Sequence, residues 1–87
     1  MLNIFKMKIK YFAWIKDITN KEFEIINQSC PKNIEELKNY LNKSYPLLEK
    51  HISKNTLRYA VNMEYTSINL DLDTDDEVAI FPPVSGG

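Results

Sequence analysis

Hydrophobic and polar residues alternate along residues 5–12 of the chain. A period of two is typical of a β-strand that buries one face. The apolar positions of this segment are expected to point inward together: Phe5, Met7, Ile9 and Tyr11. The alternation returns over 21–26 and predicts a second strand, with Phe23 and Ile25 pointing inward. Because 13–19 between them has room for only one or two helical turns, we expect an antiparallel hairpin.

The pattern changes to a helical period after the second strand. Five apolar residues follow at helical spacing: Ile34, Leu37, Tyr40, Leu41 and Leu48. Such a stripe predicts an amphipathic α-helix that packs on the sheet. Asn33 suits the N-cap position, and Glu36 three residues later suits a capping box. Pro46 is expected to end or kink the helix near Ser44 or Tyr45.

Three shorter strands are predicted in the second half of the chain. They cover 56–62, 65–70 and 78–81, and the acidic segment 71–77 forms the turn before the last of them. The first of the three buries Leu57, Tyr59 and Val61 on one side. Leu48 and Ile52, in the connection that precedes it, are expected to contact the core.

The order of these elements is β-β-α-β-β-β, which predicts an α+β fold with one main helix on one face of a mixed sheet. A chain of 87 residues forms one small domain, because it can bury only one modest core. In this layout the first and last strands can be neighbours, which would hold the base of the C-terminus. We therefore divide the chain into a domain of residues 1–83 and a projecting tail of residues 84–87.

Charge is divided unevenly along the chain. All eleven Lys and Arg residues lie at or before Arg58, where six acidic residues leave a charge of +5. The 29 residues beyond Arg58 hold six acidic residues and no basic one, which gives −6. The dispersed lysines and the net charge of −1 argue against nucleic-acid binding. Two interpretations remain, namely two differently charged surface regions or an acidic end that docks on basic partners.

The compartment is suggested by what the chain lacks. The single cysteine, Cys30, cannot form an internal disulfide, which favours a reducing environment. Lysines interrupt the apolar residues of the first 18 positions, so neither a signal peptide nor a membrane span is indicated. We expect a cytoplasmic protein without a membrane partner.

The side chains offer no catalytic centre. His51 and Cys30, each the only residue of its type, are expected at opposite ends of the main helix and in structural or neutral roles. Zinc would need more Cys or His, and the acidic segment 71–77 lacks the glycine of a calcium loop. No glycine-rich loop is available for phosphate, because both glycines are terminal. We expect no metal and no bound cofactor, and ATP would be used only by a partner.

The last seven residues read FPPVSGG and suggest a reactive terminus. Pro82 and Pro83 fix φ, remove two N–H donors and end the strand. Residues 84–87 should project as a slender strip, since Gly86 and Gly87 have no side chain to block a narrow channel. A carboxylate placed in such a channel would react after adenylation by a partner's ATP, and sulfide would then convert it to a thiocarboxylate. The alternative is a frayed terminus.

The segment DDEVAIFPPVSGG closely resembles the C-terminus of the MoaD-type sulfur carriers, the small subunits of molybdopterin synthase. Three upstream segments are similar to this family's first strand, helix start and "AVN" strand: KIKYFAWIKDI, NIEELKNYL and RYAVNMEYT. The resemblance covers residues 7–87, and residues 1–6 are either an extension of the first strand or a disordered prefix. Asp75 and Asp76 stand where the family's last turn usually carries Gly, and Asp tolerates left-handed geometry better than most residues.

The resemblance implies a ubiquitin-like β-grasp fold and a sulfurtransferase subunit whose only reactive group is its own terminus. Gly87 would be adenylated by a MoeB-type E1-like enzyme, and its thiocarboxylate would donate sulfur to cyclic pyranopterin monophosphate in the MoaE-type large subunit. The tail residues that would enter this partner are Pro82, Pro83, Val84, Ser85 and Gly86. Phe81 and Tyr65 are expected at the interface, in an assembly of two small and two large subunits.

Two other functions stay open at this point. One is a related carrier, either of the thiamine-pathway ThiS type or a ubiquitin-like protein conjugated to lysines. The ThiS type is usually shorter, and its tail is not expected to read FPPV. The other is a β-grasp interaction domain without chemistry, which would need no free Gly-Gly carboxylate.

Overall fold

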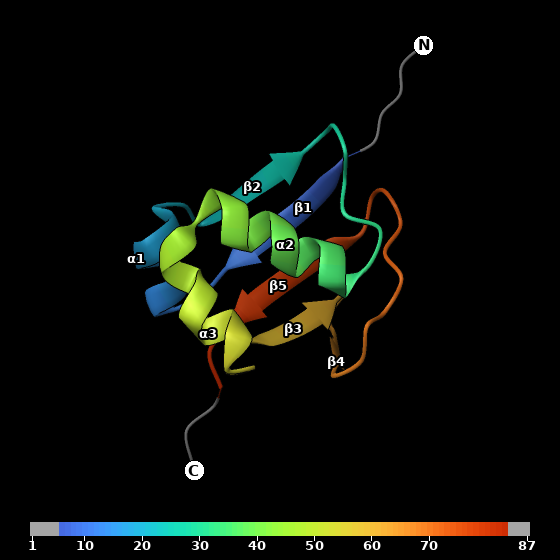
Figure 1. The fold of residues 1–87 in the computed structure, drawn as a ribbon. Helices are drawn as coiled ribbons and strands as arrows, with labels where there is room; N and C mark the ends of the chain where they lie inside the picture. Colours follow the sequence, from blue (N-terminus) through green and yellow to red (C-terminus); the bar gives the residue numbers. More distant parts are fainter. Residues whose placement is uncertain (1–5, 84–87) are drawn as a thin grey trace.

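The computed structural model describes residues 6–83, which form a mixed five-stranded sheet with α2 across one face (Figure 1). The elements in chain order are β1 (Met7–Tyr11), α1 (Trp14–Thr19), β2 (Phe23–Ile26), α2 (Ile34–Ser44), the 3-10 turn η1 (Pro46–Leu48), α3 (Glu49–Ser53), β3 (Arg58–Val61), β4 (Glu64–Thr66) and β5 (Glu77–Phe81). The strand order β2-β1-β5-β3-β4 makes the first and last strands neighbours. The predicted α+β class is confirmed. The predictions for Phe5, for most of the N-terminal prefix and for the tail residues 84–87 fall outside the described residues.

Strand β1 buries the face that its sequence predicted. Met7, Ile9 and Tyr11 are each at most 1% exposed. β1 pairs antiparallel with β2, which confirms the hairpin, and parallel with β5 on its other side. The alternating pattern was reliable here because the lysines of β1 lie on the opposite face of the sheet, away from α2.

Strand β2 corrects the prediction, because Phe23 and Ile25 do not point inward. They are 49% and 44% exposed. The pairing sets Phe23 opposite Lys10 and Glu24 opposite Ile9, so the two apolar residues share the face of the β1 lysines. A register shift of one residue exchanges the two faces of a strand, and the pattern of β2 alone does not determine its register against β1.

The inward position that these two residues leave is occupied by Glu24. Its carboxylate accepts hydrogen bonds from the hydroxyls of Tyr11, Tyr40 (2.8 Å) and Tyr45 (2.5 Å), and from Lys21 Nζ at 3.4 Å. Burial opposes ionisation of Glu24, but the three hydroxyl bonds outweigh it and lower its pKa. Burial and the bond to this carboxylate raise the pKa of Tyr40 to about 12. One carboxylate thereby joins β1, β2, the C-terminal half of α2 and Tyr45, the residue that follows this helix.

Helix α2 begins at its predicted cap. The Asn33 side chain accepts a hydrogen bond from the Glu36 N–H at 2.8 Å. The Glu36 carboxylate accepts from the N–H of Lys32 at 3.0 Å, one residue before the position that a capping box requires. Three apolar residues of the helix pack into the core: Ile34, Leu37 and Leu41. The helix ends at Ser44, and Pro46 starts the following 3-10 turn.

The connection between α2 and β3 is largely helical, which the sequence pattern did not predict. The turn η1 leads directly into α3. Leu48 and Ile52 lie in the core, as expected, with exposures of 0% and 9%. The short α3 closes the end of the sheet at which β5 stops (Figure 1).

Strands β3 and β4 form a tight hairpin, and β4 is shorter than predicted. Asn62 and Met63 both have positive φ, at 50° and 73°, as a two-residue type I′ connection requires. The prediction of a strand over 65–70 is therefore wrong, since pairing runs only from Glu64 to Thr66. The Thr66 hydroxyl accepts a hydrogen bond from the Ile68 N–H at 3.3 Å, and this local bond replaces further pairing with β3.

The turn before β5 contains the left-handed residue that the sequence suggested. Asp75 has φ 76°. The Asp76 carboxylate accepts from the Asp73 N–H at 2.7 Å and from Asn62 Nδ2 at 2.9 Å. The Asn62 side-chain oxygen accepts in turn from the Glu77 N–H at 3.0 Å. The acidic segment is thus tied to the β3–β4 hairpin and directs the chain into β5.

Candidate functional site

The candidate site is the end of β5, where the chain leaves the sheet. β5 is the middle strand, with β1 parallel on one side and β3 antiparallel on the other. Its inward residues Val78 and Ile80 are fully buried. The Phe12 N–H donates to the Ile80 carbonyl at 3.1 Å, which carries the pairing to the end of the strand. A centrally paired strand followed by Pro82 and Pro83 gives the tail a rigid base.

The predicted interface residues lie together on the face of the sheet away from α2. Phe81 stands opposite Arg58, and Tyr65 stands opposite Ala60. The rings of Tyr65 and Phe81 are 5.4 Å apart at 42°. Tyr65 is 79% exposed, although its ring is large and apolar. An exposed aromatic pair at the base of a tail is typical of a protein contact.

A groove of 420 Å³ connects this aromatic pair with the point at which the tail begins. Its lining includes Tyr65, Phe81, Pro83 and Arg58. We call it the exit groove. The sequence had pointed to Tyr65, Phe81 and Pro83, but not to Arg58, because the strand pattern alone does not show which residues of β3 and β5 are opposite each other.

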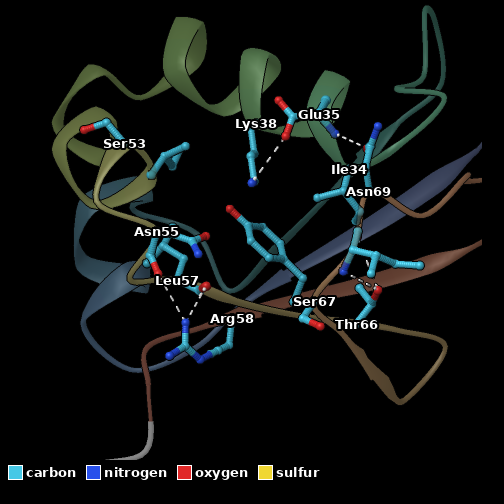
Figure 2. Close-up of a pocket in the computed structure, with 13 residues that line it drawn as sticks. Ile34, Glu35, Lys38, Ser53, Asn55, Leu57, Arg58, Thr66, Ser67 and Asn69 are labelled. Atoms are coloured by element: carbon cyan, nitrogen blue, oxygen red, sulfur yellow. Dashed lines mark hydrogen bonds and ion pairs between the residues drawn. The ribbon is translucent and has the colours of Figure 1, made fainter.

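A second hollow of 670 Å³ lies between α2, α3 and β3 (Figure 2). Figure 2 shows Lys38 and Glu35 on the helix above it and Arg58 below, and Lys38 Nζ lies 3.5 Å from the Glu35 carboxylate. The buried Tyr59 hydroxyl has no hydrogen-bond partner among residues 6–83. Burial and the nearby Glu35 raise the pKa of Tyr59 to about 12. No pattern in the sequence pointed to this hollow.

Cys30 and His51 do not form a catalytic pair. Cys30 precedes α2 and donates from its thiol to the Ile26 carbonyl at 3.2 Å, and burial raises the pKa of that thiol. His51 lies beyond the other end of α2, with its ring 4.6 Å from that of Trp14. Phe12 and Trp14 are exposed near the end of β1. The structural or neutral roles expected for Cys30 and His51 stay predictions.

Neither a metal centre nor a membrane span is found in the part of the chain that the structure describes. Among residues 6–83 no group of three or more His, Cys, Asp or Glu side chains is placed to hold a metal ion. No helix within the same residues has the length and hydrophobicity needed to cross a bilayer.

Comparisons with known proteins show the family to which this chain belongs. The ThiS family matches residues 9–87. The molybdopterin synthase sulfur carrier subunit of Dictyostelium discoideum is 34% identical over 85 residues, covering 94% of this chain and 96% of the relative. The human molybdopterin synthase sulfur carrier subunit is 32% identical over 92 residues, covering the whole of both chains.

Solved structures show the same fold. Putative molybdopterin converting factor subunit 1 of Pyrococcus furiosus has a TM-score of 0.77 and 26% identity, covering 91% of this chain and 98% of its own. The Helicobacter pylori complex of subunits 1 and 2 of molybdopterin-converting factor has a TM-score of 0.68 and 23% identity, covering 94% and 99%. The predicted ubiquitin-like β-grasp fold is confirmed.

The five-stranded sheet and the helix packed on it define a ubiquitin-like β-grasp protein. The chain belongs to the ThiS family. Its resemblance to the MoaD-type sulfur carriers, first seen in the FPPVSGG ending, is confirmed by the relatives above.

The resemblance implies that a molybdopterin synthase large subunit docks here, and on that expectation replacing Phe81 or Tyr65 by Asp should weaken this binding by about 1–3 kcal/mol each. Their adjacent rings form the apolar part of the exit groove, and the substitution removes that apolar contact and adds a charge that docking would have to desolvate. Calorimetric titration measures the change, with urea unfolding as the check on the fold. Affinity equal to that of wild type would remove both residues from the interface.

Proposed function

We propose that this protein is the sulfur-carrier subunit of molybdopterin synthase. The observation that carries the proposal is the FPPVSGG segment at the end of the central strand of a β-grasp sheet, in a chain that covers its curated relatives from end to end. Those relatives carry the molybdopterin synthase name, which favours molybdenum cofactor synthesis over the thiamine pathway.

The proposed reaction uses the Gly87 carboxylate as the carrier group. A free carboxylate resists nucleophiles, because its negative charge repels them and oxide is a poor leaving group. Its oxygen attacks the α-phosphorus of ATP on the activating enzyme, and pyrophosphate leaves. Sulfide then adds to the acyl carbon of the adenylate. The bond between this carbon and the AMP oxygen breaks, and AMP leaves with the electron pair. The product is a thiocarboxylate, which is ionised at neutral pH and strongly nucleophilic.

Two partners follow from this chemistry. A MoeB-type E1-like enzyme supplies ATP and accepts the tail first. A MoaE-type large subunit then receives Pro82 to Gly87 and holds cyclic pyranopterin monophosphate as the sulfur acceptor. A protein of the same fold is solved as a complex of subunits 1 and 2 of molybdopterin-converting factor, which supports a partner of this kind. We propose an assembly of two small and two large subunits, with no cofactor bound by the small subunit.

The test is the intact mass of the protein purified from its source. A fraction should be heavier than the encoded chain by the replacement of one oxygen by sulfur, located at Gly87 by fragmentation. Treatment with the large subunit and its pterin substrate should return that fraction to the carboxylate mass. Species joined through Gly87 to a lysine would instead establish a conjugated modifier, and a chain that never gains sulfur would contradict the proposal.

A further inference from the structure

An arginine stands beside the aromatic pair of the exit groove. Arg58 is the first residue of β3 and lies opposite Phe81, the last residue of β5. Arg58, Tyr65 and Phe81 line the same groove, and Pro83 continues its lining to the start of the tail. Any protein that binds this aromatic pair therefore has to accommodate the guanidinium.

The chain itself uses only some of the hydrogen-bond donors of this guanidinium. Nη1 of Arg58 donates to the carbonyl oxygens of Asn55 and Leu57, each at 3.3 Å (Figure 2). Within residues 6–83 no acceptor is found for Nε or Nη2, and none of the ion pairs there involves Arg58. The two backbone contacts orient the group, so less conformational freedom is lost when its other edge binds a ligand.

The acidic part of the chain does not neutralise Arg58. Residues 71–77 lead into the start of β5, whereas Arg58 lies opposite its end. The four residue steps from Glu77 to Phe81, at about 3.3 Å each, separate the two by about 13 Å. That distance exceeds the screening length of about 8 Å at physiological ionic strength. Glu35, which lines the second hollow with Arg58, is paired with Lys38.

We propose that Arg58 binds a carboxylate of the protein that docks on Tyr65 and Phe81, an Asp or Glu side chain next to that protein's apolar contact. The inference rests on the proposed function in taking the large subunit of molybdopterin synthase as this protein. The free edge of a guanidinium offers two parallel N–H donors that match a carboxylate. An apolar group there would leave the cation desolvated without a counter-charge, so an acidic group is favoured.

The test is calorimetric titration of the large subunit with carriers altered at Arg58, at low and at high salt. Arg58→Leu should weaken binding about 10- to 100-fold at low salt, and Arg58→Glu should weaken it further, since like charges would then meet. Arg58→Lys should recover only part of the loss, because an ammonium group cannot bind a carboxylate with two parallel bonds. The difference in affinity between wild type and Arg58→Leu should become smaller at high salt, because salt screens the interaction between the charges.

Lys43→Leu is the matched control. It removes the same charge from an exposed position in the last turn of α2, outside both the exit groove and the second hollow. Its affinity should equal that of wild type. Urea unfolding checks the fold of every variant, and Arg58→Gln replaces Arg58→Leu if the leucine lowers the unfolding midpoint.

The outcomes separate this inference from the proposed function. If Arg58→Leu or Arg58→Gln binds as tightly as wild type, or no more weakly than Lys43→Leu, the carboxylate contact is wrong and the carrier function stands. If wild type itself does not bind the large subunit, both fail.

Discussion

Adding one alanine after Gly87 should abolish sulfur transfer while leaving the domain folded. The extra residue moves the reacting carboxylate by up to about 3.5 Å and places a Cβ where the proposed channel requires none. A displacement of about 1 Å at a reacting centre can already lower a rate about 100-fold, so we expect at least that loss. The measurement is molybdopterin formation with the large subunit, using carrier that has passed through the activating enzyme.

A chain with one alanine added before Met1 is the control for this experiment, and it should transfer sulfur at the wild-type rate. Urea unfolding should give the same midpoint for both extended chains and wild type. Full molybdopterin formation by the chain extended after Gly87 would rule out the terminal carboxylate as the carrier group. It would favour the interaction-domain alternative, which tolerates an extension.

The second large effect concerns Glu24. Glu24→Gln should lower the free energy of unfolding by about 2–3 kcal/mol at neutral pH, because hydrogen bonds to a charged group contribute more than those to a neutral one. The amide offers one acceptor oxygen to the hydroxyls of Tyr11, Tyr40 and Tyr45, where the carboxylate offers two. Urea unfolding measures the difference. Glu22→Gln is the matched control, since Glu22 is exposed, lies two residues before Glu24 and should have a neutral effect.

The same cluster predicts a pH dependence. The folded state lowers the pKa of Glu24, so its ionised form is favoured by folding. The stabilisation is therefore complete above the unfolded pKa of about 4.3 and is lost as pH falls through the lower, folded value. Wild type and Glu24→Gln should converge in stability as the medium becomes more acidic. A constant difference between them down to that range would show that the charge of Glu24 contributes nothing.

Much of the fold follows from local sequence patterns. Three elements could be predicted from a few consecutive residues each. They are β1 from its alternation, α2 from its helical stripe and Asn33 cap, and β5 from the short apolar run before two prolines. The pair Asp75 and Asp76 was also expected to tolerate left-handed geometry, and Asp75 is the residue that has positive φ. Most candidate site residues came from the FPPVSGG ending, which is local as well, whereas Tyr65 came from the family resemblance.

Other features were decided only when the strands paired. The register of β2 against β1 turned Glu24 inward and Phe23 outward, and a slip of one residue would have reversed them. The two-residue turn at Asn62 and Met63 determined where β4 begins. Arg58 became a neighbour of Phe81 through antiparallel pairing across 23 positions of sequence, which no local pattern encodes. By itself the sequence determined which segments are strands, helix and tail; the tertiary structure decided which side chains meet, because register is a property of two strands together.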